Sequence, residues 1–212
     1  MDQPAPIHEV EHRLRQLHPD ATYELDWETP FQLLVATILA ARCTDERVNR
    51  VTKTLFAKYP DPQALADAEL EDVEQEVRPT GSYKTKAKAI QGAARELLAR
   101  FGGRVPQTMA EMITLPGVAR KTANVVLGVA FGLPSGVIVD SHVARVSQRL
   151  GLTRHDKAER IEEDLMHALP KDDWTHFGPA MVLLGRYVCK AKAPQCGECP
   201  MDEICPKHTA RA

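Results

Sequence analysis

The chain has 212 residues, a mass of 23.5 kDa and 43% hydrophobic residues, enough to bury a core in one large domain or two small ones. No apolar run approaches the roughly 20 residues of a membrane span, and Met1 to Val10 lack the basic-then-apolar pattern of a signal peptide, so we expect a cytoplasmic or nucleoid-associated protein that contacts no membrane. Taken over the whole chain, the formal net charge of −2 argues against a nucleic-acid partner.

Charge is unevenly distributed along the chain. The window 84–121 carries a net charge of +6, whereas the rest of the chain carries −8. A basic face on an acidic body can meet a phosphate backbone locally. An ordinary solvated helix face has the same charge pattern, so composition leaves both interpretations open.

Hydrophobic periodicity predicts an almost wholly helical protein. Apolar residues recur at helical spacing, and prolines or glycines end each stretch. No segment shows the alternation of a strand, and no repeat is present. The predicted helices, in chain order, span residues 31–41, 46–58, 63–69, 70–77, 84–100, 108–114, 121–131, 141–150, 156–168 and 173–188.

A glycine turn, Leu115-Pro116-Gly117, is predicted to join a short helix to a longer one. Such a turn exposes backbone N–H groups at the start of the second helix, where they and the helix dipole favour a phosphate. Lys121 lies at that helix start. A nucleophilic amine must be neutral, and partial burial, the positive helix end and the adjacent Arg120 all disfavour the charged form. The simpler interpretation is that Lys121 is one more phosphate-binding cation.

An apolar segment, 137–139, ends in a single carboxylate, Asp140, 19 residues after Lys121. Asp140 is followed by Ser141 and a predicted helix, so it can be an N-cap. A lone carboxylate facing a lysine at a helix start can also hold an amine or stabilise a developing cation.

Four of the five cysteines gather near the C-terminus with the spacing C-x6-C-x2-C-x5-C. A chain without a secretory signal keeps its thiols reduced, so a metal explains them better than disulfides do. One run of ligands with a single tight pair favours an iron–sulfur cluster, and zinc stays the alternative. Cys43 lies in an apolar run and is interpreted as a core residue. The four candidate ligands are Cys189, Cys196, Cys199 and Cys205.

Three motifs together carry a family resemblance. They are Leu-Pro-Gly-Val-x-Arg-Lys-Thr-Ala at 115–123, Val-Asp-Ser-His at 139–142 and the cysteine spacing. In this order and at these separations they resemble endonuclease III, of the helix-hairpin-helix DNA glycosylase superfamily. The resemblance covers most of the chain, from about Phe31 to Pro206.

The resemblance implies an all-α protein of two lobes. A six-helix barrel with the hairpin is expected at 22–132, and an iron–sulfur domain built from 1–21 and 133–212 is expected to hold a 4Fe-4S cluster on the four cysteines. The active site is implied to lie in the cleft between the lobes, where Lys121 meets Asp140.

The implied activity is that of a monomeric, bifunctional glycosylase and lyase on damaged double-stranded DNA. Oxidised pyrimidines are flipped out of the stack, Lys121 displaces the base, Asp140 assists, and β-elimination cuts the strand 3′ to the abasic site. Adenine-specific and mismatch-thymine relatives generally lack this lysine, so its presence favours the bifunctional branch. The residues implied to contact DNA are Arg42, Ser82, Gly117, Ala119, Arg120, Lys190 and Lys192.

The sequence departs from the family pattern at three positions. Arg42 stands where a glutamine normally fills the gap left by the flipped base, and Ser82 stands where a bulky wedge is common. Ala119 replaces a glycine, which matters if that position needs a positive φ. We therefore expect fold and lyase chemistry to be retained while damage search and substrate range are altered.

Two other classes of function compete with the enzyme. In a non-catalytic DNA-binding module, hairpin and cluster bind DNA and Lys121 is only a phosphate contact. An electron carrier would use the cluster alone, but it needs neither a hairpin nor so many helices.

Overall fold

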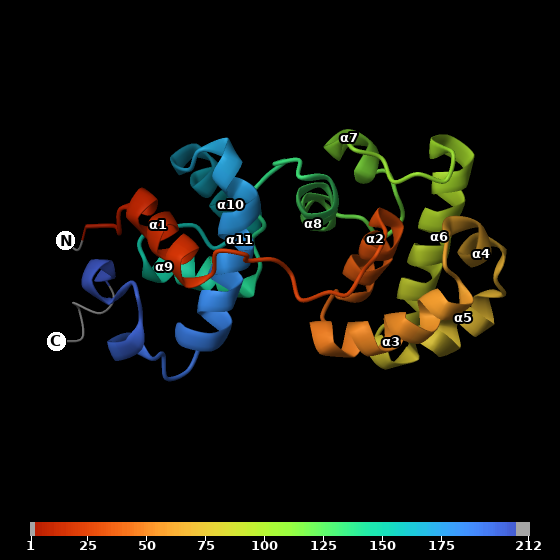
Figure 1. Cartoon of the computed structure of the whole chain (residues 1–212), viewed down its shortest axis with the longest axis horizontal. Helices are drawn as coiled ribbons and strands as arrows, with labels where there is room; N and C mark the ends of the chain where they lie inside the picture. The colour runs from red at the N-terminus through yellow and green to blue at the C-terminus, as the bar shows by residue number, and fades with distance from the viewer. Residues whose placement is uncertain (1–2, 207–212) are drawn as a thin grey trace. The chain divides into compact units, whose positions relative to one another are not determined.

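The computed structural model describes residues 3–206, and every regular element in that range is a helix (Figure 1). The expectation of an all-α protein is confirmed. Within this range, no helix combines the length and the hydrophobicity needed to cross a membrane. The chain divides into two compact units: Glu24–Leu133 forms one, and the segments up to Tyr23 and from Pro134 form the other. We call them the hairpin unit and the cysteine unit.

Short local signals set the helix boundaries of the hairpin unit. Thr29 and Asp61 each cap a helix with a side-chain oxygen and are followed by a proline at the first helical position. Gly102 and Gly132 adopt the left-handed conformation and end α6 and α8. The elements are α2 (Pro30–Leu39), α3 (Asp45–Lys58), α4 (Pro62–Asp67), α5 (Leu70–Val77), the 3-10 helix η1 (Arg78–Thr80), α6 (Tyr83–Phe101), α7 (Met109–Met112) and α8 (Arg120–Phe131).

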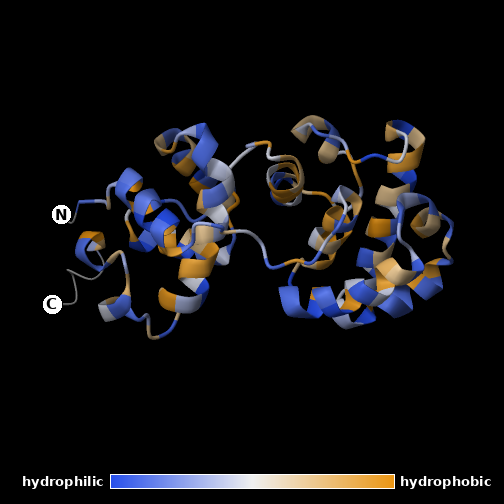
Figure 2. Cartoon of the chain, in the orientation of Figure 1, coloured by the Kyte–Doolittle hydropathy of each residue, from blue (hydrophilic) through white to orange (hydrophobic). Residues whose placement is uncertain are grey.

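The core of the hairpin unit forms around α2. Eight of its ten residues are buried, which follows from a sequence that is apolar on every side. α2 packs against α8, and α6 packs against α4 and α5. Figure 2 shows hydrophobic colours along much of α8, whereas α3 carries mostly hydrophilic ones. The hairpin is therefore built onto a largely buried helix.

The cysteine unit joins one helix from the start of the chain to the whole C-terminal third. Its last long helix contains Pro179 and passes into a short π-helix, an irregularity that the apolar run 173–188 did not predict. The elements are α1 (Ile7–Leu17), α9 (Ser141–Arg149), α10 (Ala158–Ala168), the 3-10 helix η2 (Lys171–Asp173), α11 (Trp174–Leu183), the π-helix η3 (Leu184–Val188), and the 3-10 helices η4 (Cys196–Glu198) and η5 (Asp202–Ile204).

Two glycines bring the C-terminal helices close to the segment that ends in Asp140. A Cβ on Gly178 would lie 3.1 Å from the carbonyl oxygen of Ile138. A Cβ on Gly185 would lie 2.9 Å from the Cβ of His142. Gly178 therefore packs directly on the backbone of Ile138, Gly185 packs on side chains of α9, and these contacts fix the position of Asp140 from both sides.

A buried ion pair joins α1 to α11. His176 Nδ1 lies 2.9 Å from Glu11 Oε1, and its Nε2 lies 2.9 Å from the carbonyl oxygen of His18. Both partners are acceptors, so the imidazolium, with a hydrogen on each nitrogen, satisfies both. The hydrogen bond to Glu11 raises the pKa of His176, whereas burial lowers the pKa of His18. Arg15 faces the same group, 2.8 Å from Glu11 and 2.7 Å from Asp173.

This ion pair makes stability depend on pH. A histidine whose pKa rises on folding stabilises the folded state below its unfolded value of about 6.5, and that stabilisation is lost as pH rises through the raised value. We expect His176→Gln to melt about 3–6 °C below wild type near pH 6 and the gap to shrink toward pH 9. His18, shifted in the opposite sense, is the control: the deficit of His18→Gln does not shrink at high pH. A His176→Gln gap of constant size would contradict the assignment.

Candidate functional site

The hairpin between α7 and α8 requires glycine at its turn. Gly117 has a φ of +76°, and a Cβ there would lie 2.7 Å from the Cβ of Ala89 and 3.3 Å from Ile38 Cγ2. Next to it, Pro116 packs on Gly92, where an added Cβ would lie 3.2 Å from the proline ring. The turn is therefore seated on α6 at both residues and on α2 at Gly117.

We expect Gly117→Ala to destabilise the hairpin and to weaken DNA binding. The change adds the cost of a left-handed alanine, about 1–2 kcal/mol, to a steric cost of about 1–3 kcal/mol. Gly132→Ala is the matched control, because Gly132 ends α8 with a φ of +64° and nothing lies within 4 Å of its added Cβ. Melting temperatures and affinity for duplex DNA measure both effects. Equal losses in the two variants would show that the close packing of Gly117 is unimportant.

The start of α8 carries the candidate nucleophile. Ala119 precedes the helix with a φ of −90°, so its backbone is ordinary and the substitution of the family's glycine causes no strain. Unlike Thr29 or Asp140, Ala119 offers no side-chain oxygen to the first-turn N–H groups. Arg120 and Lys121 are both exposed. The partial burial that we expected for Lys121 is not observed, because its position on the first turn leaves it in solvent.

Asp140 caps α9. Its Oδ1 accepts hydrogen bonds from the backbone N–H groups of His142, at 2.8 Å, and Val143, at 2.9 Å. Within the described chain, both recorded bonds end on this one oxygen, so the cap leaves Oδ2 for another group. The residues before it, 137–139, are buried. The carboxylate is thus held firmly from both directions, and capping is compatible with a second role. Asp140 belongs to the cysteine unit and Lys121 to the hairpin unit.

Two exposed loop residues of the hairpin unit have a left-handed backbone although neither is glycine. Arg42 follows α2 with a φ of 55°, and Ser82 precedes α6 with a φ of 47°. This conformation costs a residue with a side chain about 1–3 kcal/mol, and such residues cluster at functional sites. Two of the three residues that differ from the family pattern, Arg42 and Ser82, therefore also have a strained backbone, whereas Ala119 does not.

The four C-terminal cysteines lie at the ends of short elements. Cys189 follows η3, Cys196 begins η4, Cys199 follows η4 and Cys205 follows η5. Three of them pack against the core of the cysteine unit. Burial raises the pKa of Cys199 to about 11, and the other three thiols add to that shift through their charges. Cys43 instead packs against the core of the hairpin unit, as expected.

Two arginines on α9 hold the first cysteine's loop. Arg149 Nη1 lies 3.3 Å from Cys189 Sγ and 2.7 Å from the carbonyl oxygen of Lys190. Arg145 Nη2 donates to the carbonyl oxygens of Gly185, at 2.8 Å, and Cys189, at 3.2 Å. A cation beside a sulfur favours the thiolate that a metal requires.

The four thiols have the composition that a 4Fe-4S cluster requires, with one cysteine for each iron. A structural zinc ion also accepts four thiolates. Among the described residues, no three His, Cys, Asp or Glu side chains form a group that could hold a metal ion.

Comparison with known proteins places the chain in a family. The model of the HhH-GPD superfamily of base excision DNA repair proteins matches residues 35–171. Endonuclease III of Synechocystis sp. is 54% identical over 197 residues, which are 93% of this chain and 90% of that protein. Endonuclease III of Bacillus subtilis is 45% identical over 194 residues, 91% of this chain and 88% of that protein. The chain belongs to the endonuclease III family.

Solved structures agree with this family. A trapped endonuclease III–DNA covalent intermediate, in an estranged-adenine complex, matches with a TM-score of 0.91 and 44% identity over 97% of this chain and 96% of that one. A non-covalent endonuclease III–DNA complex matches with the same TM-score and 43% identity, again over 97% and 96%. A thermostable thymine-DNA glycosylase, 20% identical with a TM-score of 0.82, shares the fold.

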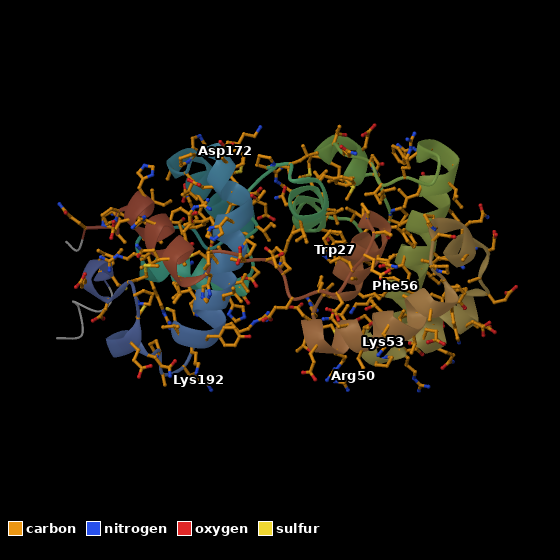
Figure 3. The ribbon with its side chains drawn as sticks, viewed as in Figure 1. Trp27, Arg50, Lys53, Phe56, Asp172 and Lys192 are labelled. Atoms are coloured by element: carbon orange, nitrogen blue, oxygen red, sulfur yellow. The ribbon has the colours of Figure 1, made fainter. Side chains whose placement is uncertain are left out.

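The lysines of the cysteine loop and of the basic window differ in placement. Lys190 and Lys192 are exposed between the first two cysteines of this endonuclease III family member, and Figure 3 shows Lys192 at the outer edge of that loop. Lys86, counted in the basic window, is buried and bonded to two backbone carbonyls. The window therefore presents one cation fewer than its sequence indicates, because charge patterning cannot tell a buried ammonium from an exposed one.

Arg149 was not anticipated from the sequence. It lies 40 residues before Cys189, at the end of α9 and outside the Val-Asp-Ser-His motif, and only the packing of α9 against η3 brings the two together. Lys86 was missed for the same reason, since its partners lie 47 and 6 residues away.

Proposed function

We propose that this chain is a bifunctional DNA N-glycosylase and AP lyase that acts on damaged double-stranded DNA in base excision repair. One observation carries the proposal. The exposed Lys121 follows a glycine hairpin at the start of α8, in a chain 44% identical to an endonuclease III that was trapped in a covalent intermediate with DNA. Because its substrate is chromosomal DNA, we propose that it acts at the nucleoid.

Lys121 is proposed as the nucleophile. Its neutral amine attacks C1′ of the flipped nucleotide, the bond from C1′ to the base breaks, and the base leaves with the electron pair and takes up a proton. The sugar ring opens to a Schiff base on Lys121. Loss of a proton from C2′ then expels the 3′ phosphate, which cuts the strand. Since Lys121 is exposed, we propose that DNA itself displaces the water that favours its charged form.

Asp140 is proposed to act on the same sugar. One of its oxygens is committed to the cap of α9, so the carboxylate has a fixed orientation and a free second oxygen. That oxygen can take up the amine proton and stabilise the positive charge that develops on the sugar as the base departs. The cap thus supplies the preorganisation that such a carboxylate needs.

Cys189, Cys196, Cys199 and Cys205 are proposed to hold a 4Fe-4S cluster. When bound, the cluster cross-links the C-terminal loop and fixes its shape. Iron and sulfide analysis of purified protein tests the assignment, with about four of each expected per chain. Zinc without sulfide would show that the four cysteines bind a zinc ion and not an iron–sulfur cluster.

The DNA contacts are proposed on both units. The backbone at Gly117, Ala119 and Arg120 suits a phosphate at the start of α8, and Lys190 and Lys192 offer cations beside the cysteines. Arg42 and Ser82 are proposed to meet the opened base pair. Arginine can donate to the O6 and N7 atoms of an orphan guanine, whereas serine is a poor wedge.

Oxidised pyrimidines are the proposed substrates, with a preference for destabilised pairs. Excision of one lesion from a mispair and from a stable pair measures this preference. If the ratio of the two rates equals that of the double variant Arg42→Gln, Ser82→Leu, these two residues do not set the substrate range.

Borohydride trapping on a duplex with one abasic site tests the proposed function. An AP lyase gives a covalent protein–DNA adduct, because borohydride reduces the Schiff base to a stable amine. A duplex without the abasic site is the control and gives none. A non-catalytic binding module would shift the duplex in a gel without forming an adduct, and that result would overturn the proposal.

A further inference from the structure

Lys86 bridges the two loops that carry Arg42 and Ser82. It lies in the first turn of α6 and is only 7% exposed. Its Nζ donates to the carbonyl oxygen of Leu39, at 2.8 Å, and to that of Thr80, at 2.7 Å. Leu39 is the last residue of α2, three positions before Arg42, and Thr80 ends η1 two positions before Ser82. One ammonium group therefore fixes the distance between the backbone just before Arg42 and the backbone just before Ser82.

The charge on Lys86 suits this place. The carbonyl end of α2 carries the negative end of the helix dipole, and an ammonium stabilises it. Burial lowers the pKa of Lys86, and Cys43 is the neighbouring titratable group that opposes this effect. An ammonium buried among carbonyls is costly to hold. If the link between the two loops served packing alone, an uncharged side chain could form it without the cost of burying a charge.

Both loops have a strained backbone close to the carbonyl groups that Lys86 binds. Arg42 and Ser82 have positive φ angles within three residues of the carbonyls that Lys86 binds. Such a backbone persists only where its surroundings hold it. The loop after α2 also has two recorded backbone hydrogen bonds, from the N–H of Ala41 to the carbonyl oxygen of Ile38, at 3.5 Å, and from the N–H of Cys43 to that of Ala40, at 3.0 Å. The bridge from Lys86 is thus placed to hold both strained turns at once.

We propose that Lys86 is a positioning residue for lesion recognition, which sets the spacing between Arg42 and Ser82 where they meet the opened base pair. This rests on the proposed function, because it assumes that these two residues contact DNA. Opening a pair requires the loops of both residues to meet the duplex at fixed positions. Phosphate binding by the hairpin does not require this spacing, and neither does attack by Lys121 on an already exposed sugar.

The test compares two substrates with Lys86→Met. Excision of an oxidised pyrimidine from a fully paired duplex requires base-pair opening, whereas cleavage of an abasic site in single-stranded DNA does not. We expect excision to fall by about 10–100-fold, the scale on which small displacements act, while single-strand cleavage changes by less than about threefold. Lys86→Gln retains two N–H donors and should recover part of the loss. Lys53→Met, at an exposed lysine on α3 outside the basic window, is the control and should leave both rates unchanged.

A spectroscopic readout separates positioning from general destabilisation. 2-Aminopurine opposite a stable abasic analogue brightens when it is unstacked, so binding of wild-type protein should raise its fluorescence and binding of Lys86→Met should raise it less at saturation. If Lys86→Met does not fold, the same measurement on Lys86→Gln decides. Equal loss of both activities in Lys86→Met, or a rise in fluorescence equal to that with wild type, would reduce Lys86 to a structural role and overturn the proposal. Absence of both activities in wild type would instead refute the proposed function.

Discussion

Lys121→Ala is expected to abolish strand cleavage at abasic sites and the borohydride adduct, with a loss of at least about 10³-fold, because no other group then forms the Schiff base. Stability should change little, since Lys121 is exposed and alanine is the best helix former. Initial rates on an abasic duplex and the yield of trapped protein measure the loss.

Arg120→Ala is the control for Lys121→Ala. It removes one cation from the same helix start, so a role in phosphate binding alone predicts equal defects in both variants. We expect Arg120→Ala to bind DNA more weakly and still to form the adduct at saturating protein. Adduct formation by Lys121→Ala at the wild-type rate would show that the nucleophile lies elsewhere.

Asp140→Asn is expected to separate base excision from lyase activity. Asparagine caps a helix as well as aspartate does, so α9 should remain intact. It cannot accept a proton or offset a full positive charge, so excision of a damaged base should fall by about 10²–10⁴-fold. At a ready-made abasic site no base departs, and trapping should fall by less than about tenfold.

Asp140→Ala serves as the comparison for the cap. It removes both the charge and the cap, so it should lose excision to a similar degree and in addition about 1 kcal/mol of stability. If Asp140→Asn lowered the yield of the borohydride adduct as much as the rate of base excision, the carboxylate would act on Lys121 alone and not on the departing base.

Most helices could be predicted from the sequence because their boundaries depend on local chemistry. Proline after Thr29 and Asp61, and glycine at 102 and 132, start and end helices through contacts within a few residues. The π-helix before Cys189 was not predictable in this way. It continues an apolar run that α11 begins, and no residue in it distinguishes a wider turn from an ordinary one.

The motifs of the site could be predicted from the sequence, but the residues that hold those motifs in place could not. Gly117, Lys121 and Asp140 lie in short patterns whose chemistry can be read directly. Lys86 and Arg149 act through carbonyls and a sulfur that are distant in sequence, and their charge alone suggests a surface position. The strained backbone at Arg42 and Ser82 was also hidden, because a left-handed conformation at a residue other than glycine is imposed by tertiary contacts.

Mass spectrometry of the borohydride-trapped adduct identifies the nucleophile directly. Trypsin cuts after Arg120, and a modified Lys121 resists cleavage, so we expect a peptide from Lys121 to Arg145 that carries the sugar remnant on its first residue. Recovery of that remnant on any other lysine, such as Lys84 or Lys190, would contradict the assignment of Lys121 as the nucleophile.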